Sequence, residues 1–82
     1  MTFRIHVRVM PRQGLLDPAG QAVEHALGAL GFTDASQVHL GRAIEFTLDA
    51  PSAAEAEQRA RAMCDRLLAN PVVEDYTVEV TA

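Results

Sequence analysis

The order in which two hydrophobic periods alternate along the chain constrains its fold most strongly. Apolar residues take every second position in 3–9 and 76–80, and in 38–49 Val38, Leu40, Ile44, Phe46 and Leu48 all fall on even positions, which is the pattern of strands with one buried face. Apolar residues repeat at helical spacing in 18–30 and 53–69. We therefore predict the order strand, helix, strand, helix, strand (βαβαβ). Because each strand is apolar on one face only, we expect both helices on one face of one sheet, a two-layer α+β sandwich.

Capping residues mark the ends of the two predicted helices. Asp17 and Pro18 supply a side-chain acceptor followed by proline at the first helical position, and Gly31 is the residue expected just past a helix end. Ser52 opens a capping box before the second helix, and Pro71 disfavours helical dihedral angles at the residue before it. Each helix is therefore bounded on both sides by local signals.

The segment 38–49 permits two interpretations. Its apolar residues keep to even positions on both sides of Gly41, so a two-residue hairpin turn there would put some of them on the wrong face. Either one long strand bends at Gly41, or a three-residue loop of residues 41–43 joins two short strands. We expect a long central strand bent at Gly41, where glycine relaxes the backbone.

Length and composition bound the class of protein. Eighty-two residues make a single domain, residues 1–82, and 49% hydrophobic against 22% charged residues suits a folded core. A core this small contributes only ~3 to 5 kcal/mol, so small domains often gain more from disulfides, metals or self-association. The single cysteine excludes an internal disulfide. With no ~20-residue apolar stretch and no signal-peptide pattern, we expect a cytoplasmic protein without a membrane partner.

The charge distribution argues against nucleic acid as a partner and singles out one strand. The net charge is −4, whereas phosphate binding needs a basic surface. Arg4, His6 and Arg8 alternate with the apolar residues of the first strand, so they share the uncovered face of the predicted sheet. That face is either solvated or binds another protein. It is also expected to hold His39, Glu45, Thr47, Thr77 and Glu79.

No pattern in the chain predicts catalysis, a cofactor or a metal site. Cys64 lies late in the second helix, far from the helix N-terminus that would stabilise a thiolate, so we interpret it as a small buried hydrophobe. The three histidines lie on different elements without zinc-site spacing, and no phosphate-binding loop is present. Glu74 and Asp75 fall in the short connection before the last strand. The residues alone thus indicate a small binding or assembly module.

Particular stretches of the chain resemble the PurS family. They read LDPAGQAV in 16–23, LG at 30–31, GRAIE in 41–45 and, above all, MCDRLLANPVVEDY in 63–76. The resemblance covers essentially the whole chain, and the D-P-x-G and C-x-x-L-L-A-N-P-V-x-E-x-Y strings are specific as a set. It implies a ferredoxin-like-related sandwich that pairs through its sheets as a homodimer, or as a tetramer of two dimers.

The resemblance also implies a function. PurS-like proteins are the small subunit of phosphoribosylformylglycinamidine synthase, which makes formylglycinamidine ribonucleotide in de novo purine biosynthesis from glutamine and ATP. In that family a large subunit performs the ATP-dependent ligation, a glutaminase subunit releases ammonia, and the small, non-catalytic subunit bridges them and assists ammonia transfer. We therefore expect these two subunits and a second copy as partners, with no cofactor and no activity of the chain alone. The alternative is a dimeric ligand-sensing regulatory module. We expect partner contacts at Arg4, His6, Arg8, Gly41, Asn70 and Pro71.

Overall fold

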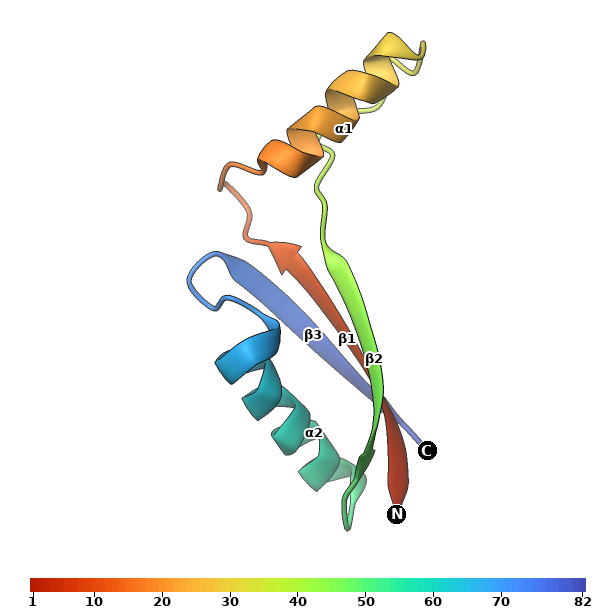
Figure 1. Ribbon diagram of the computed structural model, residues 1–82, viewed down its shortest axis with the longest axis vertical. Helices are drawn as coiled ribbons and strands as arrows, with labels where there is room; N and C mark the ends of the chain where they lie inside the picture. Colours follow the sequence, from red (N-terminus) through yellow and green to blue (C-terminus); the bar gives the residue numbers. More distant parts are fainter.

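The computed structural model describes residues 1–82 and confirms the predicted α+β class and βαβαβ order. The three strands form one antiparallel sheet in the order β2-β1-β3, so that β1 is the central strand (Figure 1). Neither helix is long and apolar enough to cross a membrane. The elements are β1 (Thr2–Pro11), α1 (Pro18–Ala29), β2 (Arg42–Asp49), α2 (Ala53–Met63), the π-helical turn η1 (Cys64–Leu68) and β3 (Glu74–Thr81).

The hydrophobic core lies between β1 and the helical layer of α2 and η1. Four alternate residues of β1, from Phe3 to Val9, are at most 4% exposed. Ala56 and Ala60 of α2 and Cys64 of η1 are fully buried against them. Small side chains on the helix let its backbone approach the sheet closely. The prediction that Cys64 is a small buried hydrophobe is therefore confirmed.

The predicted helix ends are confirmed at the residues that cap them. The side chain of Asp17 accepts a hydrogen bond from the backbone N–H of Gly20 at 3.1 Å, and Ser52 caps α2 in the same way. Gly31 adopts a φ of 99°, the left-handed conformation that favours glycine past a helix end. The second helical segment ends at η1, as a π-helical turn rather than as a regular helix, and Ala69 is extended.

The position of α1 differs from the prediction that both helices cover one face of the sheet. Only α2 covers the sheet, whereas α1 lies beyond the end of β1 (Figure 1). Residues 33–41 return along α1, and two carboxylates hold them there. Glu24 Oε1 accepts from the Val38 N–H at 3.0 Å, and Asp17 Oδ2 accepts from the Leu40 N–H at 2.8 Å. These contacts make α1 and the returning segment one unit, residues 12–41, which we call the arm.

The predicted long central strand bent at Gly41 is wrong. The strand begins only at Arg42 and lies at an edge of the sheet, and the alternative of two short strands is wrong as well. The backbone N–H groups of Val38 and Leu40 donate to the carboxylates of the arm instead of to a neighbouring strand. Gly41 is required for a different reason, since a Cβ there would overlap the carbonyl oxygen of Val9.

The arm gives the molecule an extended shape. Its dimensions are 50 × 25 × 14 Å, and its radius of gyration is 16.1 Å. A compact domain of this length would have a radius of gyration of about 12 Å. Within residues 12–41 only Gly20 is buried. The arm therefore has no hydrophobic core of its own.

Candidate partner interface

The sheet face turned away from α2, which we call the outer face, carries the predicted polar stripe. Alternation along β1 puts Arg4, His6 and Arg8 there, opposite the four core residues. The strand register places His6 between Glu45 of β2 and Glu79 of β3, and His6 Nδ1 lies 3.1 Å from Glu45 Oε1. The cross-strand neighbours of the two arginines are Ala43, Thr47, Thr77 and Thr81.

Arg4 and Arg8 are free cations on this outer face. No carboxylate lies within 4 Å of either guanidinium group, although four other arginines of the chain have such partners. An open depression of about 590 Å³ lies beside Arg8, and Gly41 and Glu45 line it. His39, predicted on a strand of this face, belongs to the arm but also lines the depression. The outer face thus offers unpaired positive charge to an acidic partner.

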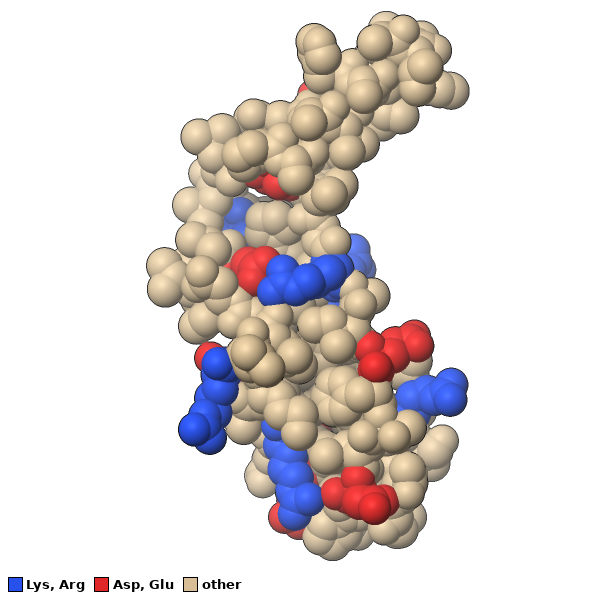
Figure 2. Space-filling view, in the orientation of Figure 1, with Lys and Arg blue, Asp and Glu red and all other residues tan.

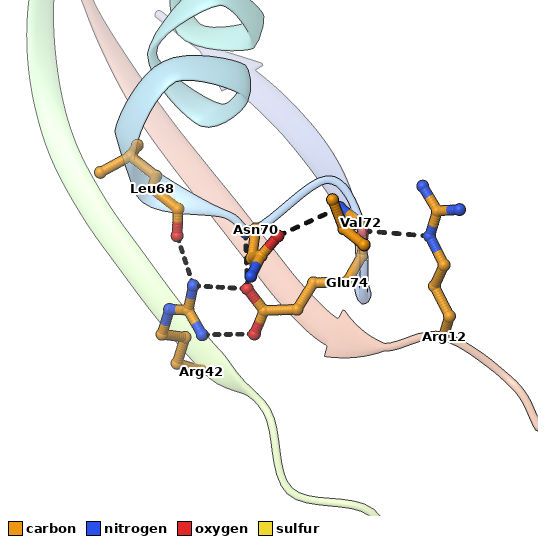
Figure 3. A network of polar contacts seen from close by, with 6 residues as sticks. All are labelled: Arg12, Arg42, Leu68, Asn70, Val72 and Glu74. Carbon is orange, nitrogen blue, oxygen red and sulfur yellow. Dashed lines mark hydrogen bonds and ion pairs between the residues drawn. The ribbon is translucent and has the colours of Figure 1, made fainter. Parts of the chain in front are cut away.

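A network of polar contacts fixes residues 69–73, the connection between η1 and β3, which we call the clamped loop (Figure 3). The guanidinium of Arg42 makes two hydrogen bonds to the carboxylate of Glu74, at 2.7 and 2.9 Å, and also donates to the Leu68 carbonyl. Glu74 Oε1 in turn accepts from the Asn70 N–H at 2.7 Å. The start of β2 is thereby tied to the start of β3 across the end of β1.

Arg12 holds the clamped loop from the other side (Figure 3). Its guanidinium donates to the Pro71 carbonyl, and its backbone N–H donates to the Val73 carbonyl at 2.9 Å. The side chain of Asn70 accepts from the Val72 N–H at 3.1 Å and so closes the loop internally. Asn70 and Pro71, both predicted partner contacts, therefore shape the loop, while Val72, at 75% exposed, is its most exposed large apolar side chain.

The charges of the network reinforce its geometry. The paired hydrogen bonds from Arg42, followed by the one from the Asn70 N–H, lower the pKa of the Glu74 carboxyl below its ordinary value. The same pairing raises the pKa of Arg42. Both groups are therefore charged at neutral pH, and a two-point contact between planar ions fixes orientation as well as distance. These contacts restrain the clamped loop.

Arg42 and Glu74 are the residues that reasoning from the sequence missed. Glu74 was expected in the connection but is the first residue of β3, and Arg42 is the first residue of β2. They meet only because both strands pair with β1. No local spacing signals a contact between residues so far apart in the chain. Their one signal is that both stand inside the stretches that resemble the PurS family.

The side chains with reactive potential are engaged in packing or hydrogen bonding. Burial raises the pKa of the Cys64 thiol, which keeps it protonated and weakly nucleophilic at neutral pH. The Tyr76 hydroxyl donates to Asp65 Oδ1 at 2.8 Å, and this hydrogen bond raises the pKa of Tyr76. The arrangement suits recognition of another protein better than covalent chemistry.

Comparisons with known proteins show the family of this chain. The family model of PurS, described as phosphoribosylformylglycinamidine (FGAM) synthase, matches residues 4–82. The phosphoribosylformylglycinamidine synthase subunit PurS of Synechocystis sp. is 51% identical over 81 residues, which are 99% of this chain and 81% of that protein. The structure of Bacillus subtilis PurS superposes with a TM-score of 0.88 at 35% identity, covering 98% of this chain and 99% of that one.

A chain in the structure of PurLQS from Thermotoga maritima also superposes with a TM-score of 0.88, at 29% identity and with 98% of both chains covered. Sequence and structure thus match along nearly the whole length, including β1, the clamped loop and the arm. The chain belongs to the PurS family, the family of the PurS subunit of phosphoribosylformylglycinamidine synthase.

Proposed function

We propose that this chain is the non-catalytic subunit that joins the synthetase and glutaminase subunits of phosphoribosylformylglycinamidine synthase and assists the passage of ammonia between them. The observation that carries the proposal is the PurS match over residues 4–82, with a likeness to a chain of PurLQS as further support. The chain acts in the cytoplasm as one domain spanning residues 1–82.

The physical reason for such a subunit lies in the chemistry of ammonia. Ammonia released into bulk water is diluted and protonated, and the ammonium ion is no nucleophile. A scaffold that holds the two active sites together raises the effective concentration of neutral ammonia at the synthetase. This task needs binding surfaces rather than catalytic groups. The chain agrees with this, because the thiol of Cys64 is buried and the unpaired Arg4 and Arg8 lie on the open outer face.

Two surfaces are assigned to the other subunits. The outer face offers the free cations Arg4 and Arg8, with His6 between them, to an acidic patch. The clamped loop offers Val72 on a backbone that Asn70 and the two arginines already hold in place, so little conformational entropy is lost when it is bound. Gly41 contributes backbone to the outer face, and Pro71 contributes backbone to the clamped loop.

The subunit acts as a homodimer in this proposal. The support is its shape, since the extended arm exposes apolar side chains that a single copy leaves uncovered. Small domains commonly gain stability by burying such surface against a second copy.

Reconstitution tests the proposed function. The purified chain is mixed with the synthetase and glutaminase subunits of the same organism, and glutamine-dependent amidine formation is followed with and without it. We expect the three proteins to co-elute, glutamine-dependent synthesis to require this chain, and neither glutaminase nor ATPase turnover from the chain alone. Failure to co-elute, full synthesis in its absence, or turnover by the isolated chain that Cys64→Ala abolishes would contradict the proposal.

A further inference from the structure

His6 lies at the centre of a balanced set of charges on the outer face. Arg4 and Arg8 lie on either side of it along β1, and Glu45 of β2 and Glu79 of β3 are its neighbours across the two strand ladders. The two arginines and the two carboxylates cancel, +2 against −2, so the set is neutral while His6 is neutral and carries +1 once His6 is protonated. One proton on His6 therefore decides whether this surface has a net positive charge.

The hydrogen bonding of His6 leaves one ring nitrogen free. Nδ1 lies 3.1 Å from Glu45 Oε1, and because an ionised carboxylate can only accept, Nδ1 is the nitrogen that donates. In the neutral ring Nε2 is then an acceptor, and it has no hydrogen-bond partner within the chain. Protonation adds an N–H at Nε2. The free nitrogen of His6 thus changes from an acceptor, which disfavours a nearby carboxylate, to a charged donor that binds one.

A partner can reach His6 on the outer face. The side chain is 35% exposed, and it lines the depression of about 590 Å³ together with Arg8, Glu45 and Glu79. Arg8 has no carboxylate of its own, so an acidic side chain that enters the depression meets one permanent cation beside a second group that becomes a cation on protonation. The depression is therefore suited to a carboxylate of another protein when His6 is charged.

Two further charged or titratable groups from other parts of the chain line the depression, and each faces a carboxylate elsewhere. His39 Nδ1 lies 3.4 Å from Asp17 Oδ2 in the arm, and Arg42 is paired with Glu74 at 2.7 Å. A proton gained by His39 is thus opposite a carboxylate of the arm. Of the two histidines at the depression, His6 is the one that lies between the free arginines.

Figure 2 shows that charges of both signs are also interspersed elsewhere on the molecule. On the side drawn there, blue and red side chains alternate over the sheet and α2, and the α1 end is nearly free of charge. No large area of one sign is seen on this side. Where opposite charges balance, one added charge makes a large relative change in the attraction of a charged partner.

We propose that protonation of His6 strengthens the binding of the outer face to an acidic patch on the synthetase or glutaminase subunit. The inference rests on the proposed function and adds a regulation to the same surface. Histidine ordinarily changes its charge between about pH 5 and pH 8. Binding takes up a proton at Nε2 of His6, which then donates to a carboxylate of the partner, so the complex assembles more tightly as the pH falls through this range.

Binding measured at about pH 8 and about pH 6 on matched variants tests the inference. We expect His6 to contribute about fivefold tighter binding at the lower pH, the change that one exposed charge pair produces. Because the other subunits titrate as well, the decisive quantity is the difference between variants. His6→Gln keeps a donor for Glu45 but cannot gain the charge, so it should lose this fivefold part. His25→Gln and His39→Gln, the controls, should retain it.

A second variant and a measurement on the unaltered chain complete the test. His6→Lys is charged at both pH values and should lack the same fivefold part while binding tightly at about pH 8. In the unaltered chain, NMR of labelled histidine rings at about pH 7 should show a larger protonated fraction of His6 in the complex than in the free chain. A pH response in His6→Gln equal to that of the unaltered chain, or a protonated fraction that stays the same or falls on binding, overturns the inference.

Failure of the inference and failure of the proposed function give different results. If the three proteins form a complex whose pH response is the same with His6→Gln, the inference fails and the proposed function stands. If no complex forms at either pH, the proposed function fails and the inference falls with it.

Discussion

The two parts of the molecule have similar hydrophobic patterns but different surroundings. In the core half, residues 1–11 and 42–82, the apolar side of α2 packs on β1 and β3. In the arm, the apolar side of α1 stays exposed beyond the end of the sheet (Figure 1). An amphipathic pattern thus identifies a helix and its apolar side, but it does not show what that side packs against.

The two parts are also held by different forces. The core half combines buried apolar side chains with a complete strand ladder. The arm relies on the carboxylates of Asp17 and Glu24, which fix its returning segment without burying apolar surface. Because hydrogen bonds contribute little net stability compared with buried apolar area, we expect the arm to open more readily than the core half.

The largest expected difference between the parts comes from truncating one apolar side chain in each. Ile5→Ala removes a fully buried side chain and should lower the free energy of unfolding by ~2 to 5 kcal/mol. Val23→Ala on α1 should change it by less than ~0.5 kcal/mol in dilute solution, where the arm is uncovered. Denaturant unfolding of both variants measures the difference. Equal costs in dilute solution would show that α1 is already packed within one chain.

Much of the core half could be predicted from the sequence because its structure follows local rules. The period of two along β1 identifies both the strand and its core residues, and Ser52 and Pro71 bound the second helical segment. Burial of Cys64 follows from its place on the apolar side of that segment. Each of these predictions depends on neighbours within a few positions along the chain.

The arm and the clamped loop could not be predicted in the same way. Val38 and Leu40 continue the period of two, yet their N–H groups are taken by carboxylates distant in the sequence, so no strand forms. Arg42 and Glu74 meet through the register of two strands on either side of β1. Such contacts depend on tertiary arrangement, which periodicity and capping do not encode.

Two glycines of α1 sharpen the comparison within the arm. A Cβ at Gly20 would overlap the Val38 carbonyl oxygen, so Gly20→Ala should favour local opening of the arm by ~1 to 3 kcal/mol. Gly28 has open space around its Cβ position, so Gly28→Ala should stabilise α1 by ~0.5 to 1 kcal/mol. Hydrogen exchange of the α1 amides measures both. Equal effects of the same sign would contradict the close approach at Gly20.

Acidification should loosen both the arm and the clamped loop. The pKa of Asp17 is lowered by hydrogen bonds from the Leu40 and Gly20 N–H groups, and the pKa of Glu74 is lowered mainly by Arg42. A carboxyl group whose pKa is lower in the folded than in the unfolded chain stabilises the folded state when it is ionised. This stabilisation is fully present above the unfolded-state pKa of ~4, and it is lost as the pH falls through the lower pKa of the folded state. Amide shifts of Leu40 and Asn70 report the two sites separately.

Two conservative variants serve as controls for the acid response. Asp17→Asn keeps one capping oxygen but removes the charge, and Glu74→Gln does the same in the clamped loop. Each should flatten the pH response at its own site and leave the other site unchanged. A response of the Leu40 amide that persists in Asp17→Asn would assign the acid sensitivity to another group.

The smallest expected effect on folding comes from the outer face. Arg4→Glu with Arg8→Glu should change the free energy of unfolding by less than ~1 kcal/mol, because neither arginine forms an ion pair within the chain. Binding to the synthetase and glutaminase subunits should weaken about thirtyfold at low salt, on the basis of ~1 kcal/mol per reversed charge. Added salt should weaken the unaltered complex in the same direction. Unchanged affinity of the double variant would mean that Arg4, His6 and Arg8 are only solvated. Arg66→Glu, on the helical layer, is the control and should leave the affinity unchanged.

The central claim is that the arm depends on a second copy while the core half does not. Hydrogen exchange of the α1 and β1 amides, followed from high to low protein concentration, tests it most directly. We predict that protection of α1 is lost on dilution as the dimer dissociates, while the strand ladder of β1 keeps its protection. Protection of α1 that stays constant at every concentration would contradict the claim, as would simultaneous loss of protection in α1 and β1.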